Sequence, residues 1–261
     1  MVWLKAEYEV GGLLSYRIPD YPSPSYAICS PLPGPSAIKL AIVATAIETT
    51  NNVESGERVF NIIKNAKIKI KTPKGIALSN LLIKRLKQSD PTKVKTELEG
   101  ICDQCGRHEK LWQIDEKRHC KQCATKLDST FGIRGYAHLS EPLTIYLEIP
   151  PEKEQQNAQY IEDIVRKVRH IGTSDSIVYC TNVSEEEPPS SCIEPQETLD
   201  KAQRNVLLVP VKDINPDPKV KFTNVNPYTD STRKDVFVKR FYLLPIARQT
   251  QGKNWLRYEL K

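Results

Sequence analysis

Four of the seven cysteines are spaced like the ligands of one metal ion. They form two Cys-x2-Cys pairs, Cys102 with Cys105 and Cys120 with Cys123, with 14 residues between the pairs. Each pair can curl into a knuckle that directs two thiolates at one ion, and two knuckles complete the tetrahedral shell of a structural Zn(2+) ion with no open catalytic position. Two disulfides are disfavoured by the odd number of cysteines and the absence of a signal peptide; a redox pair or an iron–sulfur cluster are further alternatives.

Positive charge is concentrated between residues 58 and 95, where eleven basic residues accompany one acid, although the whole chain carries only +6. Inside this stretch three apolar residues alternate with three lysines: Ala66, Ile68 and Ile70 against Lys67, Lys69 and Lys71. On a strand, successive lysines of one face stand about 7 Å apart, close to the phosphate spacing of an extended nucleic-acid strand. The pattern therefore favours a polyanionic partner, and a solvated edge strand protected by lysine is the alternative.

Apolar periodicity predicts an α+β chain around these residues. Alternation over residues 2–10 indicates a strand, and apolar residues at helical spacing after Ser36, as the N-cap, indicate a buried helix. Further strands are expected at 66–71, 143–149, 175–181, 206–211 and 236–244, the last two inside a sheet, and helices at 58–64, 80–87 and 155–168. The elements follow a β-α-β order on both sides of an insertion.

Two composition features bear on surroundings and partners. Residues 181–200 hold six acids, no base and three prolines, which predicts a solvated surface loop, with a contact for a basic partner as the alternative. No run of 18 apolar residues occurs, and the first ten residues lack a basic head followed by an apolar stretch. We therefore expect a cytoplasmic protein without membrane contact.

Several segments carry a resemblance to a known family. They are residues 11–17 (GGLLSYR), 21–26 (YPSPSY), 31–36 (PLPGPS), which lead directly into the alanine-rich helix, and 171–178 (IGTSDSIV), a glycine-containing turn into a strand. This signature resembles the RAMP-superfamily subunit that caps the 5′ end of crRNA in type I CRISPR Cascade complexes, the Cas five family. Together with the opening strand at 2–10 and the alanine-rich helix, the signature covers about 50 of the 261 residues.

The resemblance implies a ferredoxin-like, RNA-recognition-type fold with an inserted thumb. Residues 1–71 and 131–261 would form the core, with an acidic loop at 181–200, and the basic insertion at 72–130 would carry a zinc ribbon built on the four cysteines. The implied function is antiviral defence: a non-catalytic subunit that binds the crRNA 5′ handle and helps to assemble the backbone for DNA interference. The implied partners are crRNA, the neighbouring backbone subunit, the large subunit and, through the complex, target DNA.

The residues expected to contact RNA are chosen by their side-chain type and by their position near the predicted helix start or on the predicted lysine strand. The first turn of the helix after Pro35 offers free backbone N–H groups to a phosphate, which Ser36 and Lys39 would clamp. Arg17 would reach the same place from the preceding loop, and Tyr16 or Tyr26 would stack on a base, although half-buried packing accounts for either ring as well. The remaining candidates are Arg134, for which a β-bulge or tight turn is the alternative, and the three lysines Lys67, Lys69 and Lys71.

For catalysis the sequence offers little. The four histidines, His108, His119, His138 and His170, show no spacing that forces two of them together, and His138 is the best candidate for metal-independent RNA cleavage. We therefore expect a binding subunit rather than an enzyme. Two alternatives remain open: an endoribonuclease that processes precursor crRNA, and a zinc-ribbon nucleic-acid adaptor whose activity lies in the cysteine-containing segment.

Overall fold

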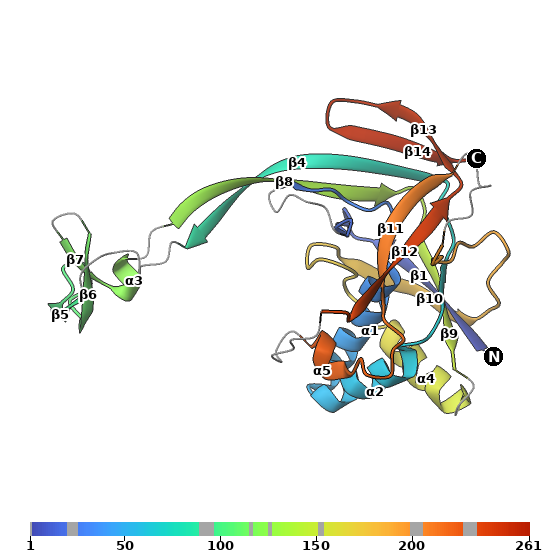
Figure 1. Ribbon diagram of the computed structural model, residues 1–261, viewed down its shortest axis with the longest axis horizontal. Helices are drawn as coiled ribbons and strands as arrows, with labels where there is room; N and C mark the ends of the chain where they lie inside the picture. The colour runs from blue at the N-terminus through green and yellow to red at the C-terminus, as the bar shows by residue number, and fades with distance from the viewer. Residues whose placement is uncertain are drawn as a thin grey trace. The chain divides into compact units, whose positions relative to one another are not determined.

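The computed structural model describes residues 2–19, 26–88, 97–114, 117–124, 127–150, 154–198, 206–226 and 234–261. Figure 1 labels the helices and strands. The chain divides into two compact units, the first made of residues 1–81 and 134–261 and the second of residues 82–133. The architecture is a mixture of antiparallel sheets and a few helices.

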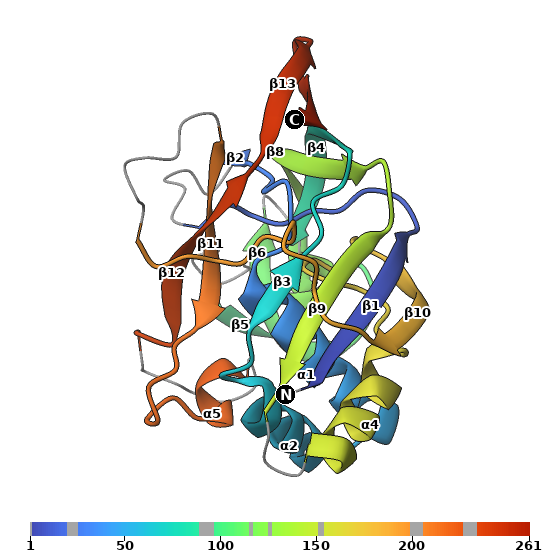
Figure 2. The ribbon, with the colours of Figure 1, turned by 90° about the vertical axis from the view of Figure 1, so that its right-hand side faces the viewer.

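A four-stranded antiparallel sheet forms the centre of the first unit. Its strands are β1 (Val2–Val10), β3 (Ile68–Ile70), β9 (Leu143–Ile149) and β10 (Val178–Glu185). They lie side by side in the order β10-β1-β9-β3, which Figure 2 shows. β1 therefore has a neighbour on each side, and the predicted strands at 2–10, 66–71 and 143–149 are confirmed.

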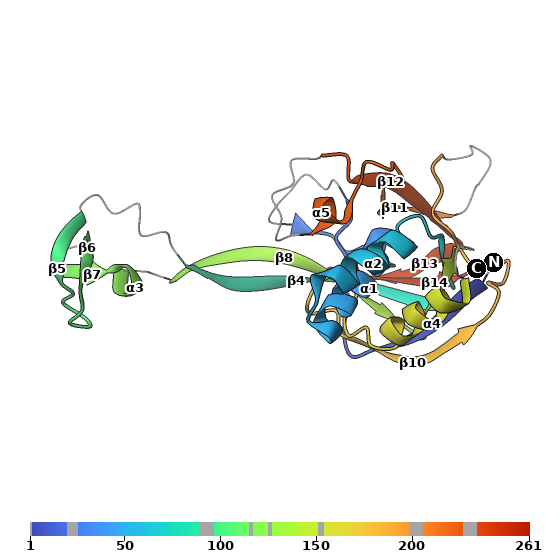
Figure 3. The ribbon, with the colours of Figure 1, turned by 90° about the horizontal axis from the view of Figure 1, so that it is seen from below.

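Three helices pack on one face of this sheet: α1 (Pro35–Thr50), α2 (Val53–Ile63) and α4 (Glu154–Val165). They lie next to one another (Figure 3), and their apolar side chains share one core with β1, where Tyr8 donates a hydrogen bond to the carbonyl of Val165 at 2.9 Å. The helix predicted to begin after Ser36 is present, but its N-cap is Gly34 and Pro35 is its first residue. Within the described ranges, no helix has the length and apolar character needed to cross a membrane.

A second sheet contains a strand where a helix was predicted. Its order is β13-β14-β4-β8-β2, formed by β13 (Ile246–Gln251), β14 (Trp255–Leu260), β4 (Gly75–Gln88), β8 (Leu127–Leu139) and β2 (Tyr26–Ala27). The helix expected at 80–87 is wrong because this segment continues β4, whose first part pairs with β14. The neighbours of β4 in the sheet, β14 and β8, both come later in the sequence and are not adjacent to it, so local periodicity does not detect the pairing.

β11 (Leu207–Ile214) and β12 (Phe237–Leu244) form a two-stranded antiparallel ribbon, and the short helix α5 (Phe222–Val225) lies between them in sequence. The prediction that both strands lie inside a sheet is wrong. One face of the ribbon packs into the core through Val209, Val211 and Tyr242, whereas Leu208 and Phe237 are exposed.

The acidic segment is bound to the first unit rather than detached from it. Residues 181–185 belong to β10, and farther along Ile193 pairs with Ile70 and Gln196 with Phe241. Its acids form three ion pairs, which join Lys5 to Glu186, Lys69 to Glu194 and Arg240 to Glu197. The segment is therefore solvent-exposed, as Glu186, Glu194 and Glu197 show, but it is not a loop detached from the core over residues 181–197. Residues 199–200 lie outside the described part of the chain.

The second unit contains a small antiparallel sheet. Its strands β5 (Glu97–Ile101), β6 (His108–Ile114) and β7 (Lys117–Cys120) lie in the order β5-β6-β7, and the single-turn helix α3 (Lys121–Ala124) follows β7. A buried leucine, Leu111, packs against Cys102 and Cys120. The apolar core of this unit is therefore centred on cysteine side chains.

Candidate metal centre and candidate nucleic-acid interface

The four predicted metal ligands converge in the second unit. Their sulfur atoms all lie within 4.8 Å of one another, and the Sγ atoms of Cys105 and Cys120 are 3.6 Å apart. Zinc–sulfur bonds of about 2.3 Å in a tetrahedron place sulfur atoms about 3.8 Å apart, so the group needs little adjustment to hold such an ion. The cluster can therefore hold a metal ion.

The backbone around Cys102 builds one of the two knuckles. Its N–H donates to the carbonyl of Arg107 at 2.9 Å, and its carbonyl accepts from Gly106 at 2.9 Å. Gly106 has a positive φ of 71°, the left-handed conformation that glycine adopts without steric cost. This tight turn returns the chain towards β6 and leaves both thiols of the pair on the same side.

Hydrogen bonds inside the cluster distribute its protons unevenly. The backbone N–H of Cys120 stabilises the thiolate of Cys102 and lowers its pKa to about 6, whereas the hydrogen bond to the thiol of Cys120 raises the pKa of Cys123 to about 12. A metal ion would replace the remaining protons, because thiolates are the ligand form of cysteine.

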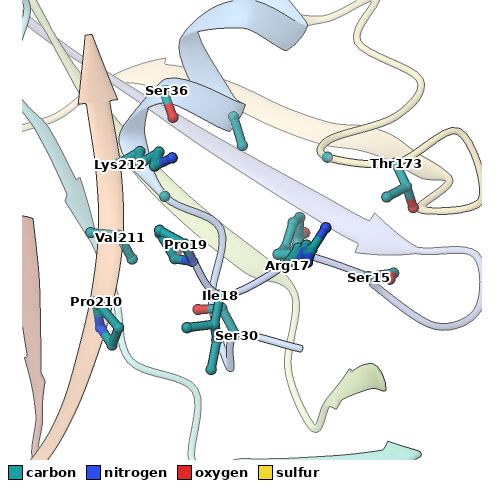
Figure 4. A pocket seen from close by; sticks show the side chains of 14 residues that line it. Ser15, Arg17, Ile18, Pro19, Ser30, Ser36, Thr173, Pro210, Val211 and Lys212 are labelled. Atoms are coloured by element: carbon teal, nitrogen blue, oxygen red, sulfur yellow. The ribbon is translucent and has the colours of Figure 1, made fainter. Parts of the chain in front are cut away.

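A cavity of about 500 Å³ lies beside the start of α1 in the first unit. Figure 4 shows its walls, which come from the chain after β1, the start of α1, the turn at Gly172 and Thr173, and β11. Two cations, Arg17 and Lys212, and the hydroxyl residues Ser15, Ser30, Ser36 and Thr173 line it. No acid lies among the described lining residues, so the local charge favours an anion.

The start of α1 contributes few free donors. Pro35 has no N–H, and the N–H groups of Ala37 and Ile38 donate to the carbonyl of Gly34. The N–H of Ser36 is the remaining donor of this first turn. β11 closes this side of the cavity, since a Cβ atom at Gly34 would lie 3.1 Å from the carbonyl oxygen of Lys212.

The opposite wall is held by a glycine turn. Gly172 has a φ of 94°, and a Cβ atom there would lie 2.5 Å from Cδ1 of Tyr16. The hydroxyl of Ser176, which is fully buried in the same turn, accepts a hydrogen bond from the N–H of Ser15 at 2.8 Å. The turn therefore fixes the backbone on either side of Tyr16 and presents Arg17 to the solvent.

Two residues that were predicted to contact RNA are buried. Lys39 is 1% exposed; its ammonium donates to Asp213 and to the carbonyl of Lys64, which contradicts its predicted role as a phosphate clamp. Burial lowers the pKa of Lys39, although Asp213 opposes the shift. Tyr16 is 5% exposed, so its ring packs against the glycine turn rather than offering a face for base stacking, and burial raises the pKa of its phenol.

Arg134 and Lys69 are partly exposed and Lys67 and Lys71 are exposed, but Arg134, Lys67 and Lys69 have protein partners. Arg134 forms an ion pair with Asp175 at 2.5 Å and donates to the hydroxyl of Ser15 at 3.3 Å. The alternation of the lysine strand is confirmed, because Ile68 and Ile70 are buried and Lys67 and Lys71 are exposed. The lysines do not form a purely basic face, however: Glu148 lies 3.9 Å from Lys67, and Glu194 lies 3.5 Å from Lys69.

Only Arg17 and Ser36 of the predicted contact residues combine cavity lining with solvent access in the described part of the chain. Tyr26 belongs to β2, but its side chain lies outside the described residues. Sequence reasoning missed Lys212 and Thr173, which line the same cavity. The turn containing Thr173 carried a signal in the segment IGTSDSIV, whereas nothing near Lys212 in the sequence indicated its place.

Comparisons with known proteins give one related sequence. The chain is 35% identical over 269 aligned positions to the CRISPR-associated protein Cas5 of Archaeoglobus fulgidus, and the match covers all of both proteins. A crystal structure of a CRISPR protein from the same organism matches with a TM-score of 0.43 and 12% identity, covering 100% of this chain and 92% of the other, which is too distant to establish a common fold. No protein-family model matches the sequence.

Proposed function

Because this chain belongs to the Cas5 family of CRISPR-associated proteins, we propose that it is a non-catalytic Cascade subunit that binds the 5′ handle of crRNA. It would cap the guide and join the neighbouring backbone and large subunits of the complex. Target DNA would reach it only through the assembled complex, since the guide reads the target by base pairing.

The observation that carries this proposal is the cavity beside α1. It combines two cations, several hydroxyl groups and a backbone N–H at a helix start, with no acid among its described lining residues. Such a set of donors suits the phosphates of a nucleic-acid strand. Arg17 is the exposed cation of this set and is therefore the first residue to test.

The topology agrees with the proposed ferredoxin-like core. The elements β1, α1, β3, β9, α4 and β10 follow one another as β-α-β-β-α-β, with α2 as an additional helix, and the sheet order places the fourth strand beside the first and the third beside the second. The strands are antiparallel throughout. This arrangement supports an RNA-recognition-type fold, with the second unit inserted between β3 and β9.

The second unit would be a zinc ribbon with one structural ion. Its three-stranded sheet and its two Cys-x2-Cys pairs support this part of the proposal. Cys102, Cys105, Cys120 and Cys123 would fill all four coordination positions of Zn(2+), so the ion would hold the fold of the unit and leave no position for water.

A binding role also agrees with the surroundings of His138, the best candidate for a catalytic base. It is exposed on β8 between Ala137 and Leu139, which are both buried. General acid–base cleavage of RNA needs a second group within hydrogen-bond reach of the same reacting bond. No such partner of His138 is found among the described residues, and we propose no catalytic residue.

Co-purification tests the proposal. The tagged chain is expressed with the neighbouring genes and a CRISPR array, and the RNA in the purified assembly is sequenced. We expect a stoichiometric short RNA with one fixed 5′ end, and Arg17→Ala should reduce its amount while Lys253→Gln, on the exposed turn between β13 and β14, should not. An assembly without RNA would overturn the proposal. Cleavage of precursor RNA by the purified chain in EDTA would overturn its non-catalytic part.

A further inference from the structure

The outer face of the β11–β12 ribbon brings two lysines directly opposite each other. The strand register pairs Lys212 with Lys239, and it pairs Pro210 with Phe241 beside them. Side chains at directly opposed positions of a strand pair start about 5 Å apart. The ammonium groups of Lys212 and Lys239 can therefore approach one phosphate.

Aromatic rings accompany the lysine pair on the same face. Lys239 lies 5.7 Å from the ring centroid of Phe241, and Phe237, two residues before Lys239, is 38% exposed. An exposed phenylalanine next to a cation is the combination with which proteins hold single-stranded nucleic acid, since a ring stacks on a base and the cation contacts the phosphate. Phe237 itself is not part of the buried core, although Ile214, its partner across the strand pair, is buried.

The two described strands place no acidic side chain on this face. The only acid of β11 and β12 is Asp213, which pairs with the buried Lys39 on the core side. Arg240 also belongs to the core side of β12, where it forms its ion pair with Glu197. The ribbon itself therefore adds positive charge to its outer face and no carboxylate.

The face adjoins the cavity beside α1, because Pro210 and Lys212 line both. We propose that the β11–β12 outer face, defined by Pro210, Lys212, Phe237, Lys239 and Phe241, is a second binding site for single-stranded RNA. Lys212 and Lys239 hold one phosphate, and Phe237 stacks on a base. The inference rests on the proposed function and deepens it: an RNA strand bound in the cavity would continue along the outer face of the ribbon.

The experiment measures the affinity of the purified full-length chain for a fluorescein-labelled oligouridylate by anisotropy at several salt concentrations. Lys239→Gln should weaken binding and reduce the slope of log affinity against log salt by about 0.7, the value for one phosphate contact of a single strand. Phe237→Ala should weaken binding about fivefold or more, and Phe237→Tyr should retain affinity because it keeps the ring. Lys253→Gln serves as the charge-matched control.

The outcomes separate this inference from the proposed function. If Arg17→Ala weakens binding while Lys239→Gln and Phe237→Ala behave like Lys253→Gln, RNA does not bind the ribbon, and only the proposed cavity site is supported. If Phe237→Ala and Phe237→Tyr lose affinity equally, Phe237 does not stack on a base. If the ribbon variants bind RNA normally but fail to co-purify with another subunit, the face is a protein interface and the inference is overturned. Failure of the wild-type chain to bind the oligouridylate also overturns it, whereas recovery of crRNA from cells tests the proposed function separately.

Discussion

The ammonium group of Lys39 lies 2.9 Å from Oδ1 of Asp213, inside the core between α1 and β11. The two residues are 174 positions apart in the sequence, and the same ammonium donates to the carbonyl of Lys64 at 2.9 Å. The pair joins the first helix to the ribbon whose other face we propose as an RNA site. It also lies next to the helix start that forms one wall of the cavity.

Lys39→Met should lower the free energy of unfolding by about 3–5 kcal/mol, because it leaves the carboxylate of Asp213 without its buried cation. Urea denaturation measures the change. The double variant Lys39→Met/Asp213→Leu should recover most of it, since an apolar pair of similar volume replaces both charges. Lys67→Met is the control: Lys67 is exposed and its ammonium lies 3.9 Å from Glu148, so this pair should contribute no more than about 1 kcal/mol. A Lys39→Met protein of normal stability that fails to bind RNA would restore the phosphate-clamp role.

Gly172→Ala should destabilise the protein by about 1–3 kcal/mol, because alanine at a φ of 94° is strained and its Cβ would clash with the ring of Tyr16. The displaced ring should also move Arg17 and weaken RNA binding. Thermal unfolding and RNA anisotropy report the two effects. Gly12→Ala is the matched control, since a Cβ atom there has no neighbour within 4 Å. Equal stability of the two variants would refute the packing role of Gly172.

Zinc content should be one ion per chain, measured by mass spectrometry of the purified protein. Cys102→Ser should lose the ion and expose the second unit to trypsin at Lys110 and Arg118, because metal binding and folding are linked in such units. The resistance of the first unit to trypsin should be the same in the Cys102→Ser protein as in the wild type. Cys192→Ser, outside the cluster, should keep the ion. Undiminished protection at Lys110 in the Cys102→Ser protein would contradict a metal-dependent fold.

Cys29 should resist alkylation in the folded protein until the pH approaches 11. Burial raises the pKa of its thiol from 9.0 to about 11, so the reactive thiolate is scarce at pH 8. Because the unfolded chain releases this proton first, the thiol contributes stability below pH 9 that is lost as the pH rises towards 11. Mass spectrometry after iodoacetamide treatment, with and without urea, measures its protection. Fast labelling of folded Cys29 at pH 8 would show that the loop before α1 is open.

Local patterns predicted the parts of this molecule that depend on neighbouring residues. The alternation of residues 2–10 indicated β1, the apolar spacing after Pro35 indicated α1, and the cysteine spacing indicated a cluster that can hold a metal. The lysine alternation also placed the correct face of β3 in the core. In each case the residues that form the pattern lie close together in the sequence, within one strand, one helix or one pair of cysteine motifs.

Contacts between distant segments explain what the sequence did not reveal. Lys39 is a cation near the start of α1, where a phosphate ligand is expected. Its burial beside Asp213 is visible only in the folded structure. Lys212 enters the cavity because β11 passes within van der Waals distance of Gly34, a contact between residues 178 positions apart. The acids of residues 186–197 suggested solvation, but their cations lie on β1, β3 and β12.

The central position of β1 has a consequence for synthesis of the chain. Its two neighbours, β9 and β10, leave the ribosome only after more than half of the protein has been made, and the ribbon that closes the cavity emerges later still. The first strand must therefore wait unpaired while the inserted unit is translated. The cavity beside α1 therefore gains its last wall only when β11 has been synthesised.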